Sequence, residues 1–201
     1  MIYLATFLYA IVGGPGVGKT SIIEELKKRD EYVIREVATD YIAEQLAEGV
    51  KEPWGRENFQ RNILVRHLAR EAAAVSDACQ KGRKHVFSDR GMLDNYVYMI
   101  LRGREDSEEY RVIDRMIKKY HVGEYYDAVF FVSPYNGGEF VCEHTEIRHE
   151  DTEESMRIHE MLRGLYVSGC KRVIEVPFGM TPEARAEFVL DQVNQIEKER
   201  E

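Results

Sequence analysis

The segment that decides the fold is IVGGPGVGKTS, residues 11–21. Gly13 is followed by four residues and then by Gly18, Lys19 and Thr20, which is the spacing G-x-x-x-x-G-K-[ST] of a phosphate-binding loop. Glycines let the backbone curl so that its N–H groups surround an anion, and the helix that follows adds the positive end of its dipole. We expect Lys19 to reach the β- and γ-phosphates of a nucleotide and the Thr20 hydroxyl to bind Mg²⁺.

The sequence on both sides of this loop supports the same interpretation. The run YLATFLYAIV (3–12) is apolar, aromatic and β-branched and predicts a buried strand, whereas KTSIIEELKKRD (19–30) has the spacing of a helix. A glycine-rich turn without a ligand would not need this order of strand, loop and helix. The sequence therefore predicts a nucleoside triphosphate, with ATP as the expected cofactor, held by Gly13, Gly14, Pro15, Gly16, Val17, Gly18, Lys19, Thr20 and Ser21.

Length, charge and the apolar start of the sequence indicate which further partners and which location to expect. The 201 residues suffice for one domain, 1–201, and the net charge of −8 gives no basic footprint for nucleic acid. The cluster KGRKH (81–85) is more typical of a solvated helix end. The apolar segment 1–12 carries no basic n-region and no small-residue cleavage site, is too short to span a bilayer and runs directly into the phosphate-binding loop. We expect a soluble, cytoplasmic protein; its oligomeric state is not fixed by these features.

The three cysteines, Cys79, Cys142 and Cys170, are scattered and odd in number, which is typical of reduced thiols. Cys142 with His144 and His149 could bind a metal, but no fourth ligand at regular spacing accompanies them, so a metal centre of this kind is not expected.

Strand-like and helical runs alternate along the chain. The strand-like runs are FLYAIV (7–12), YVIR (32–35), HVFS (85–88), AVFFV (128–132) and RVIEV (172–176). Long helices are expected over 56–81, over 152–168 and after Pro182. This alternation predicts an α/β fold in which a five-stranded parallel sheet is sandwiched by helices.

The segment 133–151, SPYNGGEFVCEHTEIRHED, is rich in turn formers and follows the fourth strand. Long loops in compact domains are usually functional, so we interpret it as a lid-like insertion over the nucleotide; a surface insertion without function is the alternative. Arg148 lies late in this segment and would neutralise charge on the γ-phosphate in a closed state, or would be one of many exposed arginines.

Two further motifs contain polar residues at the ends of predicted strands. HVFSDRG places Asp89 where a carboxylate would complete the Mg²⁺ shell opposite Thr20. Arg90 could clamp a phosphate or an acceptor, although an Asp–Arg pair that caps the next helix is an alternative. In VIREVATDYI, Glu36 falls at the carboxyl end of the second strand, where ligands of parallel sheets bind. It could orient or deprotonate an acceptor hydroxyl, or form a surface salt bridge.

With these motifs in order, the chain resembles the small AAA-type P-loop NTPase domain that is related to the ribosylnicotinamide kinase part of bacterial NAD-biosynthesis regulators. The resemblance rests on GGPGVGKTS, REVATDYI, FSDRGMLDN, YDAVFFVSP, RHEDTEESMRIHEMLRGLY and VIEVPFGMTPEARAEFV, which together span nearly the whole chain. It implies a nucleoside-kinase-like fold with Lys19 and Thr20 on phosphate and Mg²⁺, Asp89 after the third strand, Arg148 in the lid and Glu36 on the acceptor side.

One departure keeps the acceptor open. DRG (89–91) stands where the riboside kinases carry a D-x-D type of sequence, and it is closer to the DR of thymidylate and deoxynucleoside kinases. The functional prediction is a Mg²⁺-dependent kinase that moves the γ-phosphate of ATP to a small nucleoside-like acceptor, such as a riboside. The alternative is a nucleotide-dependent regulatory ATPase or GTPase that acts through a protein partner. No N-K-x-D-like guanine-reading motif occurs, and the chain is too short for the additional helical domain of a mechanical AAA+ machine.

Overall fold

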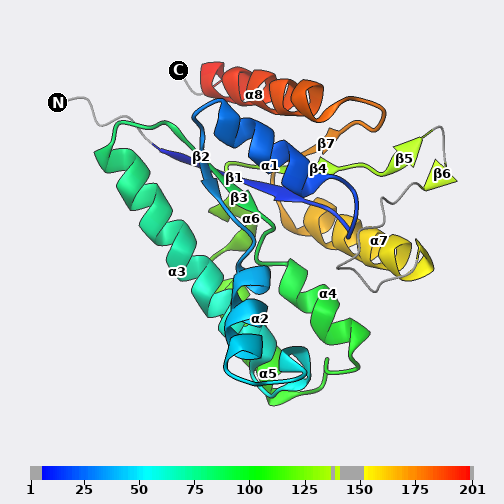
Figure 1. Ribbon diagram of the computed structural model, residues 1–201. Helices are drawn as coiled ribbons and strands as arrows, with labels where there is room; N and C mark the ends of the chain where they lie inside the picture. The colour runs from blue at the N-terminus through cyan, green and yellow to red at the C-terminus, as the bar shows by residue number, and fades with distance from the viewer. Residues whose placement is uncertain (1–5, 137–138, 141–151, 200–201) are drawn as a thin grey trace.

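Five parallel strands form the central sheet of the computed structural model, which describes residues 6–136, 139–140 and 152–199. The order is β2-β3-β1-β4-β7 (Figure 1). The strands are β1 (Phe7–Val12), β2 (Tyr32–Ile34), β3 (His85–Asp89), β4 (Ala128–Val132) and β7 (Val173–Val176). Each matches a predicted strand to within a residue, so the prediction of a five-stranded parallel sheet is confirmed.

Helices connect the strands and cover both faces of the sheet. They are α1 (Lys19–Lys28), α2 (Val37–Ala47), α3 (Phe59–Gln80), α4 (Asp94–Leu101), α5 (Glu108–Lys119), α6 (Val122–Tyr125), α7 (Thr152–Gly169) and α8 (Pro182–Lys198), with a 3-10 turn η1 (Pro53–Gly55) before α3. The predicted helices over 19–30, 56–81, 152–168 and after Pro182 are confirmed as α1, α3, α7 and α8. The sequence analysis did not predict α2, α4, α5 or α6.

The two faces of the sheet have separate cores because side chains alternate along each strand. Leu8, Ala10 and Val12 of β1 face a core completed by α3, α4, α5 and α7. Tyr9 and Ile11 face the opposite core, which α1 and α8 cover (Figure 1). This sandwich buries both faces of the central strands β1, β3 and β4, as a parallel sheet requires.

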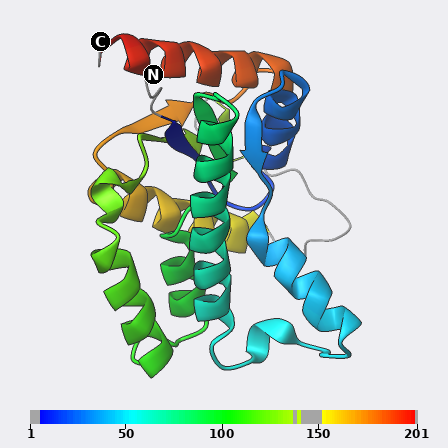
Figure 2. The ribbon, with the colours of Figure 1, turned by 90° about the vertical axis from the view of Figure 1, so that its left-hand side faces the viewer.

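A group of helices extends beyond the carboxyl ends of β2 and β3. The N-terminal half of α3 packs against α2 and α5, and α4 packs between α3, α5 and α7 (Figure 2). Tyr41 of α2 stacks on Phe59 of α3 at a ring distance of 5.5 Å, and its hydroxyl accepts a hydrogen bond from Asn62. These helices form one side of the edge of the sheet at which the predicted site residues lie.

The predicted lid insertion, 133–151, is described only at its start. Tyr135–Asn136 (β5) and Glu139–Phe140 (β6) pair as a short antiparallel ribbon directly after β4. The rest of the segment, including Arg148, Cys142, His144 and His149, lies outside the described residues, so the lid stays a prediction.

Candidate active site

The phosphate-binding loop joins the carboxyl end of β1 to α1. β1 lies between β3 and β4 in the sheet, with Ile11 in register with Asp89 on one side and with Phe130 on the other. The loop ends at Gly18, whose φ of 92° is left-handed, and no side chain caps the N-terminus of α1. Thr20 and Ser21 are exposed in its first turn. The free end of the helix thus faces the site with backbone N–H groups that can hold an anion.

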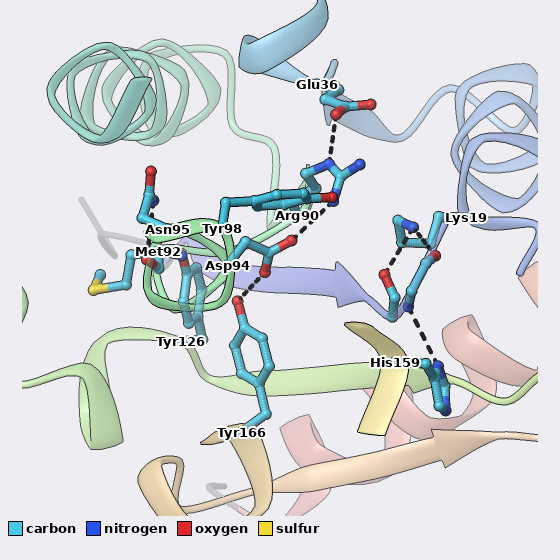
Figure 3. Close-up of polar contacts among 12 residues, drawn as sticks. Lys19, Glu36, Arg90, Met92, Asp94, Asn95, Tyr98, Tyr126, His159 and Tyr166 are labelled. Carbon is cyan, nitrogen blue, oxygen red and sulfur yellow. Dashed lines mark hydrogen bonds and ion pairs between the residues drawn. The ribbon is translucent and has the colours of Figure 1, made fainter. Parts of the chain in front are cut away.

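Lys19 is folded onto the loop that it follows. Its side chain is buried, with 3% of the residue exposed, and Nζ donates to the carbonyl oxygens of Gly13 at 2.8 Å and Gly14 at 2.6 Å (Figure 3). A buried ammonium group held by carbonyls at the mouth of an anion-binding loop is placed to reach a phosphate by a change of rotamer.

His159 of α7 contacts the phosphate-binding loop at Gly14. The backbone N–H of Gly14 donates to His159 Nδ1 at 3.3 Å. Burial lowers the pKa of His159 to about 4, which keeps the imidazole neutral so that Nδ1 can accept. A Cβ on Gly14 would lie 2.8 Å from His159 Cβ, so a glycine is needed for this close approach.

Asp89 provides the carboxylate at the end of β3. Only 4% of the residue is exposed, and burial raises its pKa to about 6, against the charge of Lys19, which lowers it. Its buried Oδ1 has no hydrogen-bond partner among the described residues. A buried carboxylate oxygen without a donor, on the strand next to β1, together with the exposed Thr20 hydroxyl at the start of α1, offers oxygen ligands of the kind that Mg²⁺ prefers. Among residues 6–136, 139–140 and 152–199, no group of three His, Cys, Asp or Glu side chains gathers as metal ligands.

Glu36 and Arg90 form an ion pair at the carboxyl ends of β2 and β3. Glu36 follows β2 as the N-cap residue of α2, and Arg90 follows β3 with a left-handed φ of 77°. Arg90 Nε donates to Glu36 Oε1 at 2.5 Å (Figure 3). Side-chain exposure is 13% for Arg90 and 18% for Glu36, so the pair is largely withdrawn from solvent. Burial opposes the charge of Arg90, but the adjacent Glu36 carboxylate holds its pKa well above the usual value.

The ion pair continues into the protein through Asp94 of α4. Arg90 Nη1 donates to Asp94 Oδ2 at 3.1 Å, and the Tyr166 hydroxyl of α7 donates to Asp94 Oδ1 at 2.7 Å (Figure 3). A Cβ on Gly91 would lie 2.4 Å from the Tyr166 oxygen. The glycine of DRG therefore leaves the space in which Tyr166 reaches Asp94. Tyr98 of α4 completes the surroundings, with its ring 5.7 Å from the guanidinium of Arg90.

A pocket of about 310 Å³ opens on the other side of the phosphate-binding loop. One wall belongs to the loop and the start of α1, and the other to the segment between β7 and α8. Its lining comprises Gly16, Val17, Gly18, Ser21, Phe178, Gly179, Met180, Thr181, Pro182 and Arg185. Its volume and its position beside the loop suit the ring of a nucleotide base.

Four of the five predicted catalytic residues meet at the carboxyl edge of the sheet: Lys19, Glu36, Asp89 and Arg90. The fifth, Arg148, lies outside the described residues. Glu36 and Arg90 bind each other in a largely buried ion pair, and no side-chain hydrogen bond caps the N-terminus of α4. Sequence reasoning missed Asp94, His159, Tyr166 and Arg185. Of these, Asp94 had a signal, because it stands four residues after Arg90 at the start of a helix.

The strand order, the glycine-rich loop after β1 and the carboxylate at the end of β3 define the chain as a P-loop NTPase of the α/β class. The family model described as an AAA domain matches residues 8–185. The chain therefore belongs to this AAA domain family. A comparison with curated proteins gives no match.

Solved structures share the fold. The NadR protein in complex with NR matches with a TM-score of 0.69 at 18% identity, over 96% of this chain and 52% of that chain. The NadR protein in complex with NAD and AMP-PNP matches with a TM-score of 0.62 at 18% identity, over 96% and 49%. Deoxyadenosine kinase from M. mycoides with bound dCTP matches with a TM-score of 0.61 at 15% identity, over 94% and 100%. The chain spans about half the length of the NadR structures. The predicted resemblance to nucleoside-kinase-like P-loop domains is confirmed.

Within the described residues, no helix is long and apolar enough to cross a membrane.

Proposed function

We propose that this chain is a Mg²⁺-dependent phosphotransferase that moves the γ-phosphate of ATP to a hydroxyl group of a small nucleoside-like acceptor. The observation that carries the proposal is the Glu36–Arg90 pair, at 2.5 Å, beside the end of the sheet that also holds Lys19 and Asp89. A site built only to hydrolyse or sense a nucleotide has no need of a second cluster of charged, largely buried side chains beside Lys19 and Asp89.

The donor nucleotide would lie across the phosphate-binding loop. Its phosphates would face the loop backbone and Lys19, and its base would enter the pocket beside Phe178. When bound by Thr20 and Asp89, Mg²⁺ would offset the charge that builds up on the phosphate oxygens. Lys19 would leave the carbonyls of Gly13 and Gly14 and bind the β- and γ-phosphates instead.

The acceptor would lie against Glu36. The Glu36 carboxylate would accept a hydrogen bond from the attacking hydroxyl and take its proton as the new bond to phosphorus forms. The bond between the γ-phosphorus and the bridging oxygen of ATP would break at the same time, and ADP would leave. Arg90 holds Glu36 in place and binds Asp94 with another nitrogen. Because two carboxylates already engage its guanidinium, Arg90 is a poor anchor for a phosphate on the acceptor. This charge arrangement favours an unphosphorylated acceptor over a nucleoside monophosphate.

Related structures support the same class of acceptor. The NadR structure holds NR, and the M. mycoides kinase is named for deoxyadenosine. Arg148 and the insertion 133–151 would complete the donor side as a lid, the whole chain 1–201 would be a single domain, and the enzyme would act in the cytoplasm.

The test is a phosphotransfer assay with Mg·ATP and paired acceptors. Nicotinamide riboside, deoxyadenosine and other nucleosides would each be offered beside the matching monophosphate, with products read by mass spectrometry. We expect a phosphorylated nucleoside and little product from the monophosphates. Lys19→Ala is expected to lower kcat/KM by about 10³, and Glu36→Gln by about 10²–10⁴.

The matched control is Glu44→Gln, on the same helix as Glu36. Glu44 forms an exposed ion pair with Arg66, which contributes little, so this variant is expected to keep wild-type activity. Slow loss of ATP that needs Lys19 but not Glu36, with no acceptor modified, would contradict the proposal. It would favour a regulatory ATPase that acts through a protein partner.

A further inference from the structure

Arg185 of α8 is a buried cation whose described hydrogen bonds go to carbonyl oxygens. It is 7% exposed. Nη1 donates to the carbonyl of Val17 at 2.9 Å, Nε to that of Pro177 at 3.2 Å and Nη2 to that of Ser133 at 3.4 Å. These three carbonyls belong to the phosphate-binding loop, the end of β7 and the end of β4. One guanidinium therefore ties together three segments that are far apart in sequence.

These bonds join the two walls of the pocket beside the phosphate-binding loop. Val17 belongs to the loop wall, and Pro177 precedes Phe178 on the opposite wall. The guanidinium lies 5.7 Å from the centre of the Phe178 ring, within the range of a cation–π contact. A Cβ on Gly18 would lie 3.0 Å from Arg185 Nη1, so the guanidinium sits directly behind the last turn of the loop.

The fork of the guanidinium is what makes this arrangement possible. Arginine presents donors in a fixed plane and can bind several carbonyls at once, whereas the ammonium of lysine is a single point. The position of α8 also depends on its own N-terminus, where Thr181 accepts from the backbone N–H of Ala184 at 3.3 Å and Pro182 begins the helix. Through its hydrogen bond to Val17, Arg185 therefore fixes the distance between α8 and the phosphate-binding loop.

We propose that Arg185 is a positioning residue that sets the base wall, Phe178–Pro182, at the correct distance from the phosphate-binding loop. The base and the phosphates of one nucleotide can then bind at the same time. The inference rests on the proposed function only in taking a nucleoside triphosphate as the ligand. By holding the pocket in place before the nucleotide binds, Arg185 would increase the contribution of the base to nucleotide affinity, although it does not itself contact the phosphates.

The test compares two ligands by titration calorimetry, in the presence of Mg²⁺ and without acceptor. ATP reports on base and phosphates together, and inorganic tripolyphosphate reports on the phosphates alone. We expect Arg185→Met to lower the ratio of the affinity for ATP to the affinity for tripolyphosphate by about tenfold or more. The affinity for tripolyphosphate itself is expected to change by less than about threefold. Arg185→Lys is expected to lower the ratio in the same direction but less, because it keeps the charge and loses the fork.

Controls separate this role from a structural one. Arg115→Met removes an exposed arginine of α5 that pairs with Glu108 and is expected to leave both affinities unchanged. A merely structural Arg185 would lower both affinities together or only the melting temperature, and either result overturns the proposal. A wild-type ratio in Arg185→Lys overturns it as well, and this variant is available if Arg185→Met does not fold.

Failure of the proposed function has a different signature. A protein that prefers ATP over tripolyphosphate but phosphorylates no acceptor would contradict the phosphotransferase and still support the role of Arg185. A wild-type protein that binds tripolyphosphate as tightly as ATP would overturn the base pocket and the role of Arg185 together.

Discussion

The two halves of the site are built from different parts of the chain. The half that we propose for the donor is mostly backbone: the loop from Gly13 to Gly18, the uncapped start of α1, and the carbonyls that hold Lys19 and Arg185. The half that we propose for the acceptor consists of side chains: a series of hydrogen bonds joins Glu36, Arg90, Asp94 and Tyr166. It connects the N-terminus of α2 to α7. A triphosphate presents the same groups in every nucleotide, so a backbone cradle suits it, whereas an acceptor must be recognised by side chains.

One helix supports both halves. His159 of α7 accepts from the loop at Gly14, and Tyr166, seven residues later on the same face of the helix, donates to Asp94. Displacing α7 at either position should therefore affect one half more than the other. Variants at these two contacts test whether the halves are as separate as their construction indicates.

Of the variants at the two α7 contacts, Gly14→Ala is expected to have the larger effect. Its Cβ would lie 2.8 Å from His159 Cβ and 3.1 Å from the Ser155 carbonyl, so the loop or α7 must shift. A misplacement of about 1 Å can reduce the rate of a reaction by about 10², and we expect ATP affinity and kcat/KM to fall by a similar factor. Binding of the acceptor, measured without nucleotide by calorimetry, is expected to change much less.

Gly164→Ala is the matched control on α7. A Cβ at Gly164 would meet nothing within 4 Å, so ATP affinity is expected to stay unchanged. Alanine is also a better helix former than glycine, and the melting temperature is expected to rise with a gain of about 0.5–1 kcal/mol. If Gly14→Ala binds ATP as tightly as Gly164→Ala, the close approach between loop and helix has no functional role.

Tyr166→Phe is expected to have a smaller effect, and on the half of the site proposed for the acceptor. The change leaves the Oδ1 atom of Asp94 without the hydroxyl that donates to it at 2.7 Å inside the protein. Leaving a buried acceptor unsatisfied costs about 1–3 kcal/mol of stability. Because Asp94 helps to hold Arg90 against Glu36, we also expect kcat to fall by about tenfold, with the dissociation constant of ATP unchanged.

The exposed Tyr120 provides the control for that change, since Tyr120→Phe removes a hydroxyl at the surface. It is expected to leave both stability and kcat at wild-type values. A Tyr166→Phe variant with weakened ATP binding and normal kcat would contradict the view that the two halves of the site act separately.

The difference between the halves also explains what the sequence could predict. The loop is a local motif whose geometry requires glycines at fixed spacing, so its residues and the strand and helix around it could be identified directly. The sheet was predicted because parallel strands are buried on both faces and appear as continuous apolar runs. Glu36 and Arg90 were found because each follows a strand.

The contacts between elements could not be read in this way. No local pattern brings Tyr166 to Asp94, which is 72 residues away, or Arg185 to Val17, which is 168 residues away. The missed helix α5 is a different case. Ser107 caps it and Ile113 and Ile117 give it an apolar stripe, so its signal is present in the sequence. α4 is apolar on most of its surface and resembles a buried strand.

The smallest effect on activity is expected from a change at His85, which lies at the end of the sheet away from the site. This change provides a reference for variants in both halves of the site. His85, at the start of β3, lies with Nδ1 3.3 Å from Glu31 and with Nε2 2.6 Å from Glu197 of α8. Burial lowers the pKa of His85, but the hydrogen bonds to these two carboxylates outweigh burial and raise it above the ordinary value. The protonated ring donates to both carboxylates and thereby links β3 to α8.

A raised pKa in the folded state means that this link stabilises the protein fully below the unfolded pKa of His, about 6.5, and is lost as the pH rises through the folded value. We expect wild type to melt at a higher temperature than His85→Gln at pH 5.5, and the difference to shrink by pH 8.5. ATP affinity and kcat at pH 7.5 are expected to be the same in both, because His85 is at the far end of β3 from Asp89. A difference in melting temperature that grows with pH would mean that the neutral ring, and not the charged one, makes the link.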